Sequence, residues 1–360
     1  MEPHSLQATS HPAAYTVQPY TPDAALAVLE LARTALGQTP ATPMTADFWR
    51  WKHEVNPFGP SYGLVAWDGP DATPIGVRLF LRWMWQTPDG SRLPAVRAVD
   101  TATHPAHRRR GIFSRLTRQA LEELARDGVA LVFNTPNGQS LPGYLKLGWR
   151  LVAHWPLYLR PLRPGRMLAR RLRPYRGTPA AFDAYFGPGI LPWEAFRARF
   201  GAELPALLAT WEQARPRRGL RTPRTLAYLD WRYGGHPHVP YGVVPLVGEG
   251  RPEALLGFAV LRPNVRFGWQ EVVWTELCLA EPSPELGKRL LRTLTRQVRG
   301  DYLIAHFARG SWEQRLLARW GFWPLPRRGL TFVVRPLQPE FEYAIRPDAW
   351  DLTLGDLELF

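Results

Sequence analysis

The sequence predicts an α/β protein made of two units of similar architecture, each a mixed central sheet flanked by helices. Apolar segments of strand length alternate with amphipathic helical segments, and the order of these elements repeats in the second half of the chain. The 360 residues are enough for two substantial cores, and an aromatic content of 12% excludes a disordered or fibrous chain.

The first unit is expected over residues 1–160. Alternating and apolar runs predict its strands at 15–19, 62–67, 75–85, 93–103, 129–134 and 151–159. Helical spacing predicts its longer helices at 22–36, 47–53 and 112–126. Thr45 is expected to cap the second of these helices, and Asp89 with Gly90 marks a hairpin turn between two strands.

A basic turn from His104 to Ser114 separates the strand at 93–103 from the helix that follows. A strand, a tight turn and a helix together present backbone N–H groups that have no helical partner, and such groups can hold a pyrophosphate. Gly111 lets a ligand approach the backbone closely, and the neighbouring arginines can add charge-assisted hydrogen bonds. The alternative is an ordinary basic turn before a surface helix.

A second informative segment begins where the apolar strand at 129–134 ends at Asn134. A short loop leads to a helical stretch that carries Tyr144 and ends at Gly148 and Trp149. The uninterrupted apolar character of the strand suits a central position in the sheet.

These two segments resemble motifs A and B of the GNAT N-acetyltransferases. In motif A, Q/R-x-x-G-x-G/A ahead of a helix, the marked positions are Arg108, Gly111 and Phe113, and Phe113 replaces a small residue. In motif B, the tyrosine and the Gly-aromatic pair that follows it are Tyr144, Gly148 and Trp149. Both motifs occur in the expected order, with a helix and a strand between them.

The resemblance implies that the protein binds acetyl-CoA as a co-substrate. It implies that the pantetheine arm pairs with the backbone of Thr101, Ala102 and Thr103. It implies that the pyrophosphate is held by Arg108, Arg109, Arg110, Gly111, Ile112, Phe113 and Ser114. Asn134, Gln139 and Ser140 are then expected beside the pantetheine and its thiol end. Tyr144 is the family's proton donor to the coenzyme A thiolate, and a protonated phenol is a suitable general acid; a core-facing aromatic is the alternative.

The general base is less clearly marked. Members of the family often carry a Glu on the strand before motif A, and the aligned residue here is Arg97. Strand alternation places Asp100 on the face opposite Arg97 and Thr101. The other nearby candidates are His53, Glu54 and His104. Tandem acetyltransferases related to the "enhanced intracellular survival" enzymes use the carboxylate of a final Phe as base, and this resemblance implies the same role for Phe360.

A connector rich in Arg and Pro is expected over 161–224, a second GNAT-like unit over 225–337 and a tail over 338–360. The expected strands of the second unit are at 241–247, 255–261, 272–279 and 302–307. Helices are expected at 192–200, 204–213, 284–298 and 311–320. An acidic, proline-rich segment, residues 281–284, stands where the basic turn should be, so this copy is degenerate and one acetyl-CoA is expected per chain.

The composition restricts the partners. A net charge of +14 favours polyanionic ligands such as coenzyme A. Residues 160–176 hold seven arginines and no acid, which predicts a solvated linker helix and not a nucleic-acid site. Cys278 is the one cysteine, and His236 with His238 lacks further ligands, so no disulfide and no metal are expected. Without a signal pattern or a membrane-length apolar run, a cytoplasmic protein with no membrane partner is expected.

These features predict an N-acetyltransferase that acts on a primary amine of a small molecule or peptide by direct transfer in a ternary complex. One alternative is an acyltransferase with another acyl-CoA or an aminoacyl donor. A second is a coenzyme A-binding or regulatory protein without turnover. A third is a nucleic-acid-associated protein that uses the arginine run. A homo-oligomer is compatible with all of these.

Overall fold

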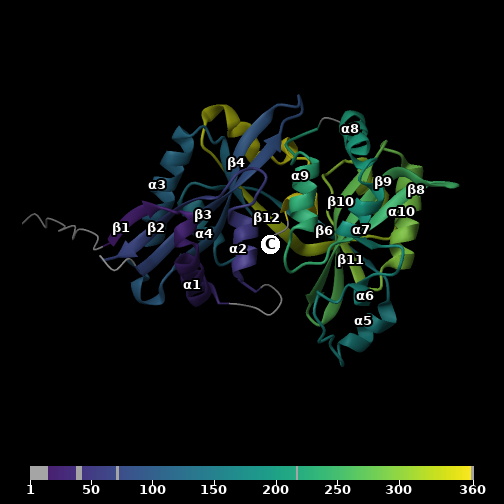
Figure 1. Cartoon of the computed structure of the whole chain (residues 1–360), viewed down its shortest axis with the longest axis horizontal. Helices are drawn as coiled ribbons and strands as arrows, with labels where there is room; N and C mark the ends of the chain where they lie inside the picture. Colours follow the sequence, from purple (N-terminus) through teal and green to yellow (C-terminus); the bar gives the residue numbers. More distant parts are fainter. Residues whose placement is uncertain (1–14, 38–42, 70–72, 216–217, 358–360) are drawn as a thin grey trace, which may run out of the picture.

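The computed structural model describes residues 15–37, 43–69, 73–215 and 218–357, with backbone alone for 326–328. These residues form a 12-stranded mixed sheet in the order β1-β2-β3-β4-β5-β12-β6-β11-β10-β9-β8-β7. The first unit occupies one end of this sheet and the second unit occupies the other, with β12 and β6 between them (Figure 1).

The elements of the first unit follow the expected order. Its strands are β1 (Tyr15–Pro19), β2 (Tyr62–Asp68), β3 (Thr73–Gln86), β4 (Arg92–Thr103), β5 (Leu131–Asn134) and β6 (Arg150–Pro161). Its helices are η1 (Pro22–Ala24), α1 (Ala25–Leu36), α2 (Ala46–His53), η2 (Pro105–His107), α3 (Ile112–Arg126) and α4 (Leu141–Lys146). The expected cap of α2 is confirmed, because the hydroxyl of Thr45 accepts a hydrogen bond of 3.2 Å from the amide of Phe48.

The second unit repeats this order after a helical connector. Its strands are β7 (Leu191–Pro192), β8 (Gly242–Gly248), β9 (Arg251–Arg266), β10 (Trp269–Leu279), β11 (Tyr302–Ala305) and β12 (Trp323–Pro336). The connector and second unit contain α5 (Pro164–Arg170), α6 (Phe182–Tyr185), α7 (Trp193–Phe200), α8 (Leu204–Ala214), α9 (Leu226–Leu229), η3 (Asp230–Gly234), α10 (Pro284–Gln297) and α11 (Trp312–Arg319). The tail carries η4 (Pro339–Ile345), η5 (Pro347–Ala349) and α12 (Leu354–Leu357).

The two units exchange their last strands. β12, which ends the second unit, pairs antiparallel with β5 of the first, with Val333 opposite Asn134. β6, which ends the first unit, pairs antiparallel with β11 of the second, with Leu159 opposite Ile304. Each half of the sheet is therefore completed by a strand from the other half. The division of the chain at residues 160, 224 and 337 stays a prediction.

Helices cover both faces of the first unit. Val77 and Leu79 of β3 face the core layer that contains α1 and α2, whereas Phe80 faces the layer that contains α3 and α4. Gly76 lets α3 lie close to the sheet, because a Cβ at this position would be 2.4 Å from a methyl carbon of Ile112.

The parallel strands β4 and β5 separate where the site is expected. They pair only from Ala95 to Arg97, opposite Leu131 to Phe133. β5 ends one residue later at Asn134, whereas β4 continues to Thr103 with only β3 beside it. The backbone edge of β4 beyond Arg97 is thus left without a strand partner on the β5 side.

Candidate functional site

The basic turn has the backbone shape of an anion-binding loop. Arg109 has φ 66° and Gly111 has φ 76°, so two residues of the turn adopt left-handed conformations. Alternating conformations of this kind direct successive N–H groups into one concavity. α3 begins directly afterwards at Ile112, and the first N–H groups of a helix have no partner within it. The expected pyrophosphate residues are thereby brought together around one concave turn.

The arginine side chains of the turn are accessible to a ligand. Arg108, Arg109 and Arg110 are all exposed. Arg108 donates a hydrogen bond of 3.2 Å to the carbonyl oxygen of Ala35, at the end of α1. None of the ion pairs among the described residues uses Arg109 or Arg110. Two guanidinium groups are therefore available for phosphate oxygens.

Asp100 forms a β-bulge in the middle of β4. Arg78 of β3 lies opposite Thr101 and Leu79 lies opposite Val99, so Asp100 is the extra residue, and its φ is 33°. Strained backbone of this kind is found preferentially at functional sites. The strand segment expected to pair with the pantetheine arm, Thr101 to Thr103, follows directly.

The bulge corrects the expected faces of β4. Asp100 contacts α2 on the face that also holds Arg97, whereas the Thr101 hydroxyl accepts from Arg78 on the opposite face. The prediction that Arg97 and Thr101 share a face and Asp100 lies opposite them is wrong. It assumed strict alternation, and one inserted residue reverses the alternation beyond it.

Two side chains of α2, the cation Lys52 and the imidazole of His53, hold the Asp100 carboxylate. The ammonium of Lys52 lies 2.6 Å from Asp100, and Nε2 of His53 lies 3.0 Å from it. Burial alone would raise the pKa of Asp100, but these partners outweigh it and hold that pKa well below its usual range. Burial lowers the pKa of His53, so its ring is neutral at pH 7. Asp100 is consequently a poor proton acceptor, and its contacts with Lys52 and His53 join the bulge to α2.

Tyr144 lies at the opening between β4 and β5. Its side chain is only 8% exposed, and its hydroxyl accepts a hydrogen bond of 3.3 Å from Nη1 of Arg78. The same Arg78 nitrogen donates to the hydroxyl of Thr101 on β4. The structure thus brings the expected acid next to the expected pantetheine strand, through an arginine that the motifs do not mark.

The loop before α4 is organised by Asn137, another residue outside the motifs. Its side-chain oxygen accepts hydrogen bonds from the amide of Gln139 at 3.1 Å and from the amide of Ser140 at 2.9 Å. Asn134, at the end of β5, is buried, and its side-chain oxygen accepts from the amide of Thr135 at 2.8 Å. Asn134 thus lies at the end of β5, and Gln139 and Ser140 lie in the loop that Asn137 holds before α4.

Arg97 binds the C-terminal tail. This arginine is fully buried, and its Nη2 donates to the carbonyl oxygen of Leu357 at 2.8 Å and to the hydroxyl of Thr135 at 2.9 Å. Phe360 lies outside the described residues. Arg97 stands at the position that commonly carries a Glu in the GNAT resemblance, and here this cation binds the tail at Leu357.

A buried ionic cluster also holds the tail at Asp356, one residue before Leu357. Arg224 donates to the carboxylate of Asp356 at 2.8 and 3.0 Å and to that of Glu276 at 3.0 and 3.1 Å. Tyr233 donates to the other oxygen of Glu276 at 2.8 Å. Burial would raise the pKa of Asp356, but Arg224 overcomes this effect and lowers it. Removing Arg224 would leave the buried carboxylates of Asp356 and Glu276 without their cation.

The tail also fills the opening of the second unit. Thr353 bridges to Phe307 just beyond the end of β11, and Leu354 packs against Val273 and Ile304. This space corresponds to the opening between β4 and β5 in the first unit. The tail therefore blocks the second opening and then reaches Arg97 at the edge of the first.

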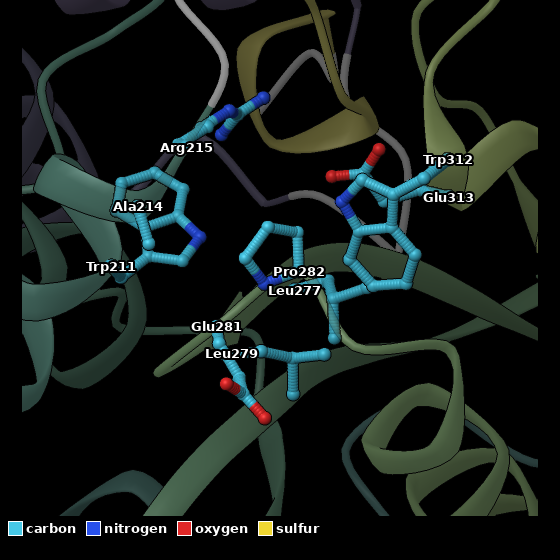
Figure 2. A pocket seen from close by; sticks show the side chains of 9 residues that line it. All are labelled: Trp211, Ala214, Arg215, Leu277, Leu279, Glu281, Pro282, Trp312 and Glu313. Carbon is cyan, nitrogen blue, oxygen red and sulfur yellow. The ribbon is translucent and has the colours of Figure 1, made fainter.

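The counterpart of the pyrophosphate turn is also closed in the second unit (Figure 2). A cavity of about 10 Å³, the room of roughly one water molecule, lies between the end of β10, the start of α11 and α8. Figure 2 shows Pro282 with Trp211 and Trp312 around it, and the carboxylates of Glu281 and Glu313 at its border. Arg215 also lines this cavity, but a space of this volume is too small for a pyrophosphate.

The histidine pair and the arginine run noted in the sequence form local contacts among the described residues. Among the described residues there is no cluster of three or more His, Cys, Asp or Glu side chains suited to a metal. Nδ1 of His236 accepts from the amides of His238 and Val239, both at 3.2 Å, so this histidine organises its own loop. In the arginine run, Arg166 and Arg170 pair with Asp301. In the part of the chain that the structure covers, no helix has the length and apolarity needed to cross a bilayer.

Comparison with known proteins agrees with this geometry. Residues 16–152 match the family model described as an acetyltransferase (GNAT) domain. No curated protein has detectable sequence similarity to the chain.

Solved structures share the fold of both units. A conserved protein of unknown function from Enterococcus faecalis V583, a probable N-acyltransferase, has a TM-score of 0.59 at 14% identity, over 90% of this chain and 73% of that one. Eis1 from Mycobacterium abscessus has a TM-score of 0.55 at 18% identity, over 92% and 76%. A GCN5-related N-acetyltransferase from Anabaena variabilis has a TM-score of 0.57 at 12% identity, over 90% and 73%. The chain therefore contains an acetyltransferase (GNAT) domain over residues 16–152.

Proposed function

We propose that the protein is an acetyl-CoA-dependent N-acetyltransferase that acts on a primary amine by direct transfer in a ternary complex. The observation that carries this proposal is the convergence of three features at one end of the sheet. These are the concave turn at Arg109 and Gly111, the unpaired edge of β4 and the hydroxyl of Tyr144. An extended, anionic thioester donor fits this arrangement from its pyrophosphate to its acyl group.

Each group has a role in this proposal. The turn and its arginines bind the pyrophosphate, and the free edge of β4 from Thr101 to Thr103 pairs with the pantetheine arm. The strained bulge at Asp100 places unpaired backbone groups close to the thioester. Tyr144 donates a proton to the departing thiolate as the amine attacks the carbonyl carbon.

The proposed base is the carboxylate of Phe360. Its support is the anchoring of Leu357 by Arg97, three residues earlier. Three extended residues span at most about 10 Å, so this role requires the thioester to lie within that reach of Leu357. Deleting Leu359 and Phe360 should reduce turnover strongly and spare acetyl-CoA binding. Adding two glycines after Phe360 should do the same, because the carboxylate moves while every side chain stays. Normal turnover in both variants would exclude this base.

A panel of amines tests the proposed function. Aminoglycosides, polyamines, amino sugars and peptide amines are incubated with acetyl-CoA, and released thiol is followed together with the mass of the amine. Propionyl-CoA and longer acyl-CoA donors are run in parallel. Amine-dependent thiol release with the mass increase of one acetyl group supports the proposal. Preference for a longer donor would mean that the protein transfers that acyl group instead of acetyl. Tight coenzyme A binding without any transfer would indicate a binding protein.

A further inference from the structure

Arg78 is a buried cation in an otherwise apolar part of β3. Its side chain is fully buried, and its Nη1 donates to the hydroxyls of Thr101 and Tyr144. Its Nε and Nη2 have no hydrogen-bond partner, and no carboxylate of the described residues forms an ion pair with it. A buried cation without an anion is costly, so its retention beside Tyr144 calls for a reason.

Aromatic rings form the rest of its environment. The guanidinium carbon lies 4.5 Å from the ring centre of Phe80, 5.6 Å from that of Phe113 and 5.4 Å from that of Tyr144. Such contacts compensate part of the desolvation of the cation. Phe113 occupies the motif position where the family has a small residue, and it also borders Gly143 of α4. The departure from the motif thus helps to enclose Arg78 against Tyr144.

We propose that Arg78 is a positioning residue for acyl transfer that acts through Tyr144. This inference rests on the proposed function, in which Tyr144 protonates the thiolate. Arginine has hydrogen-bond donors and no acceptor, so the Tyr144 oxygen must accept in their contact. The phenolic proton is then directed away from Arg78 and is free for the sulfur.

The charge changes of the reaction give Arg78 its effect. The amine nitrogen bonds to the carbonyl carbon, the carbon–sulfur bond breaks with its electron pair on sulfur, and the proton of Tyr144 moves to that sulfur. The Tyr144 oxygen is left negative beside Arg78 until it recovers the proton that the attacking nitrogen loses. Before this step the hydrogen bond joins the Arg78 cation to a neutral phenol. During the step it joins the same cation to an oxygen that becomes negative. It therefore stabilises the transition state more than the bound substrate.

A double-mutant cycle tests the proposal with the most reactive amine of the panel as the acceptor. The variants are Arg78→Met, Tyr144→Phe and both together. Arg78→Met should lower kcat roughly 100-fold, as loss of a transition-state donor does, with little change in KM for acetyl-CoA. The double variant should be no slower than Tyr144→Phe, because Arg78 acts only through that hydroxyl. The solvent deuterium isotope effect on kcat should fall toward one in both single variants.

Two further variants separate structural from chemical effects. Arg82→Met removes a cation from the same strand outside this cluster and should leave kcat and KM unchanged. Arg78→Lys keeps the charge and should recover part of the lost rate; it also replaces Arg78→Met in the cycle if circular dichroism shows that the methionine variant is unfolded. Multiplicative losses in the cycle, or an unchanged isotope effect, would overturn the role of Arg78. Full turnover in Tyr144→Phe would instead overturn the acid assignment in the proposed function.

Discussion

Arg97 and Leu357, 260 positions apart in the sequence, are joined by a hydrogen bond of 2.8 Å from the guanidinium to the carbonyl oxygen. This contact ties the end of the tail to β4 at the point where β4 and β5 separate. Thr353 and Leu354 of the tail pack against the second unit, and Leu357 then reaches Arg97 of the first. The second unit therefore holds the segment of the tail that precedes its contact with the first unit.

Replacing Arg97 by Met should detach the tail from the opening. The variant loses charge-assisted hydrogen bonds to Leu357 and Thr135, which are worth about 2 kcal/mol in unfolding free energy. We expect turnover to fall at least tenfold while the acetyl-CoA dissociation constant stays within a few-fold. Steady-state kinetics and calorimetric titration measure the two. Arg92→Met, an exposed change at the start of β4, is the control, and equal effects of both variants would contradict a specific role for the anchor.

Stability should fall between pH 7.5 and pH 5. Burial lowers the pKa of His306 to about 4 and also lowers that of His53. The unfolded chain therefore binds more protons than the folded chain below the ordinary histidine pKa, so stability decreases as pH falls through this window. His306 alone should cost about 2 kcal/mol at pH 5. Urea unfolding at both pH values measures the difference, which should shrink in His306→Gln. A difference of unchanged size in that variant would exclude His306 as a source.

Replacing Asp100 by Asn should destabilise the bulge. Lys52 would remain buried without its carboxylate, and breaking a buried pair from one side costs about 3 kcal/mol or more. We expect a lower thermal midpoint and a reduced kcat, because the backbone groups at the bulge lose their fixed position. Glu122→Gln, an exposed change on α3, should leave both quantities unchanged. If Asp100→Asn is as stable and active as the wild type, the bulge does not depend on this carboxylate.

Replacing Gly111 by Ala should weaken acetyl-CoA binding. A Cβ at this position meets nothing within 4 Å, so the cost comes from the left-handed φ of 76°. A penalty of roughly 1 kcal/mol on the bound conformation corresponds to about a fivefold rise in KM for acetyl-CoA. Gly128→Ala carries the same strain, with φ 76° and open space, at the other end of α3. Gly128→Ala should lower stability without changing KM for acetyl-CoA. A similar KM in the two variants would show that the turn at Gly111 does not bind acetyl-CoA.

Local patterns in the sequence were enough to predict the basic turn and the strand–helix order around it. Gly111 and Tyr144 were identified from the spacing of residues within short motifs. That spacing is local in the sequence and does not depend on contacts with distant parts of the chain. The bulge at Asp100 was not predictable, because one inserted residue changes the faces of β4 without altering its strand composition. The signal for Arg78 was present as a cation within an otherwise apolar stretch of β3, but its partner Tyr144 on α4 lies far along the chain.

The exchange of β6 and β12 depends on pairing between units, which no local pattern encodes. Proline at 324 and 336 removes backbone donors from β12, so its segment does not resemble a strand. Arg97 stood out as a departure from the family's Glu, yet its partner became clear only when the tail was seen beside it. Residues whose roles depend on contacts between the two units are therefore the ones that sequence patterns miss.

The central claim is that Tyr144 serves acyl transfer at an acetyl-CoA site formed by the first unit. The most direct measurement is the amine-dependent rate of coenzyme A release at saturating acetyl-CoA, in the wild type and in Tyr144→Phe. The account predicts release by the wild type and a rate roughly 100-fold lower in the variant, with one acetyl-CoA bound per chain in both. Equal rates in the two proteins, or two acetyl-CoA molecules bound per chain, would contradict it.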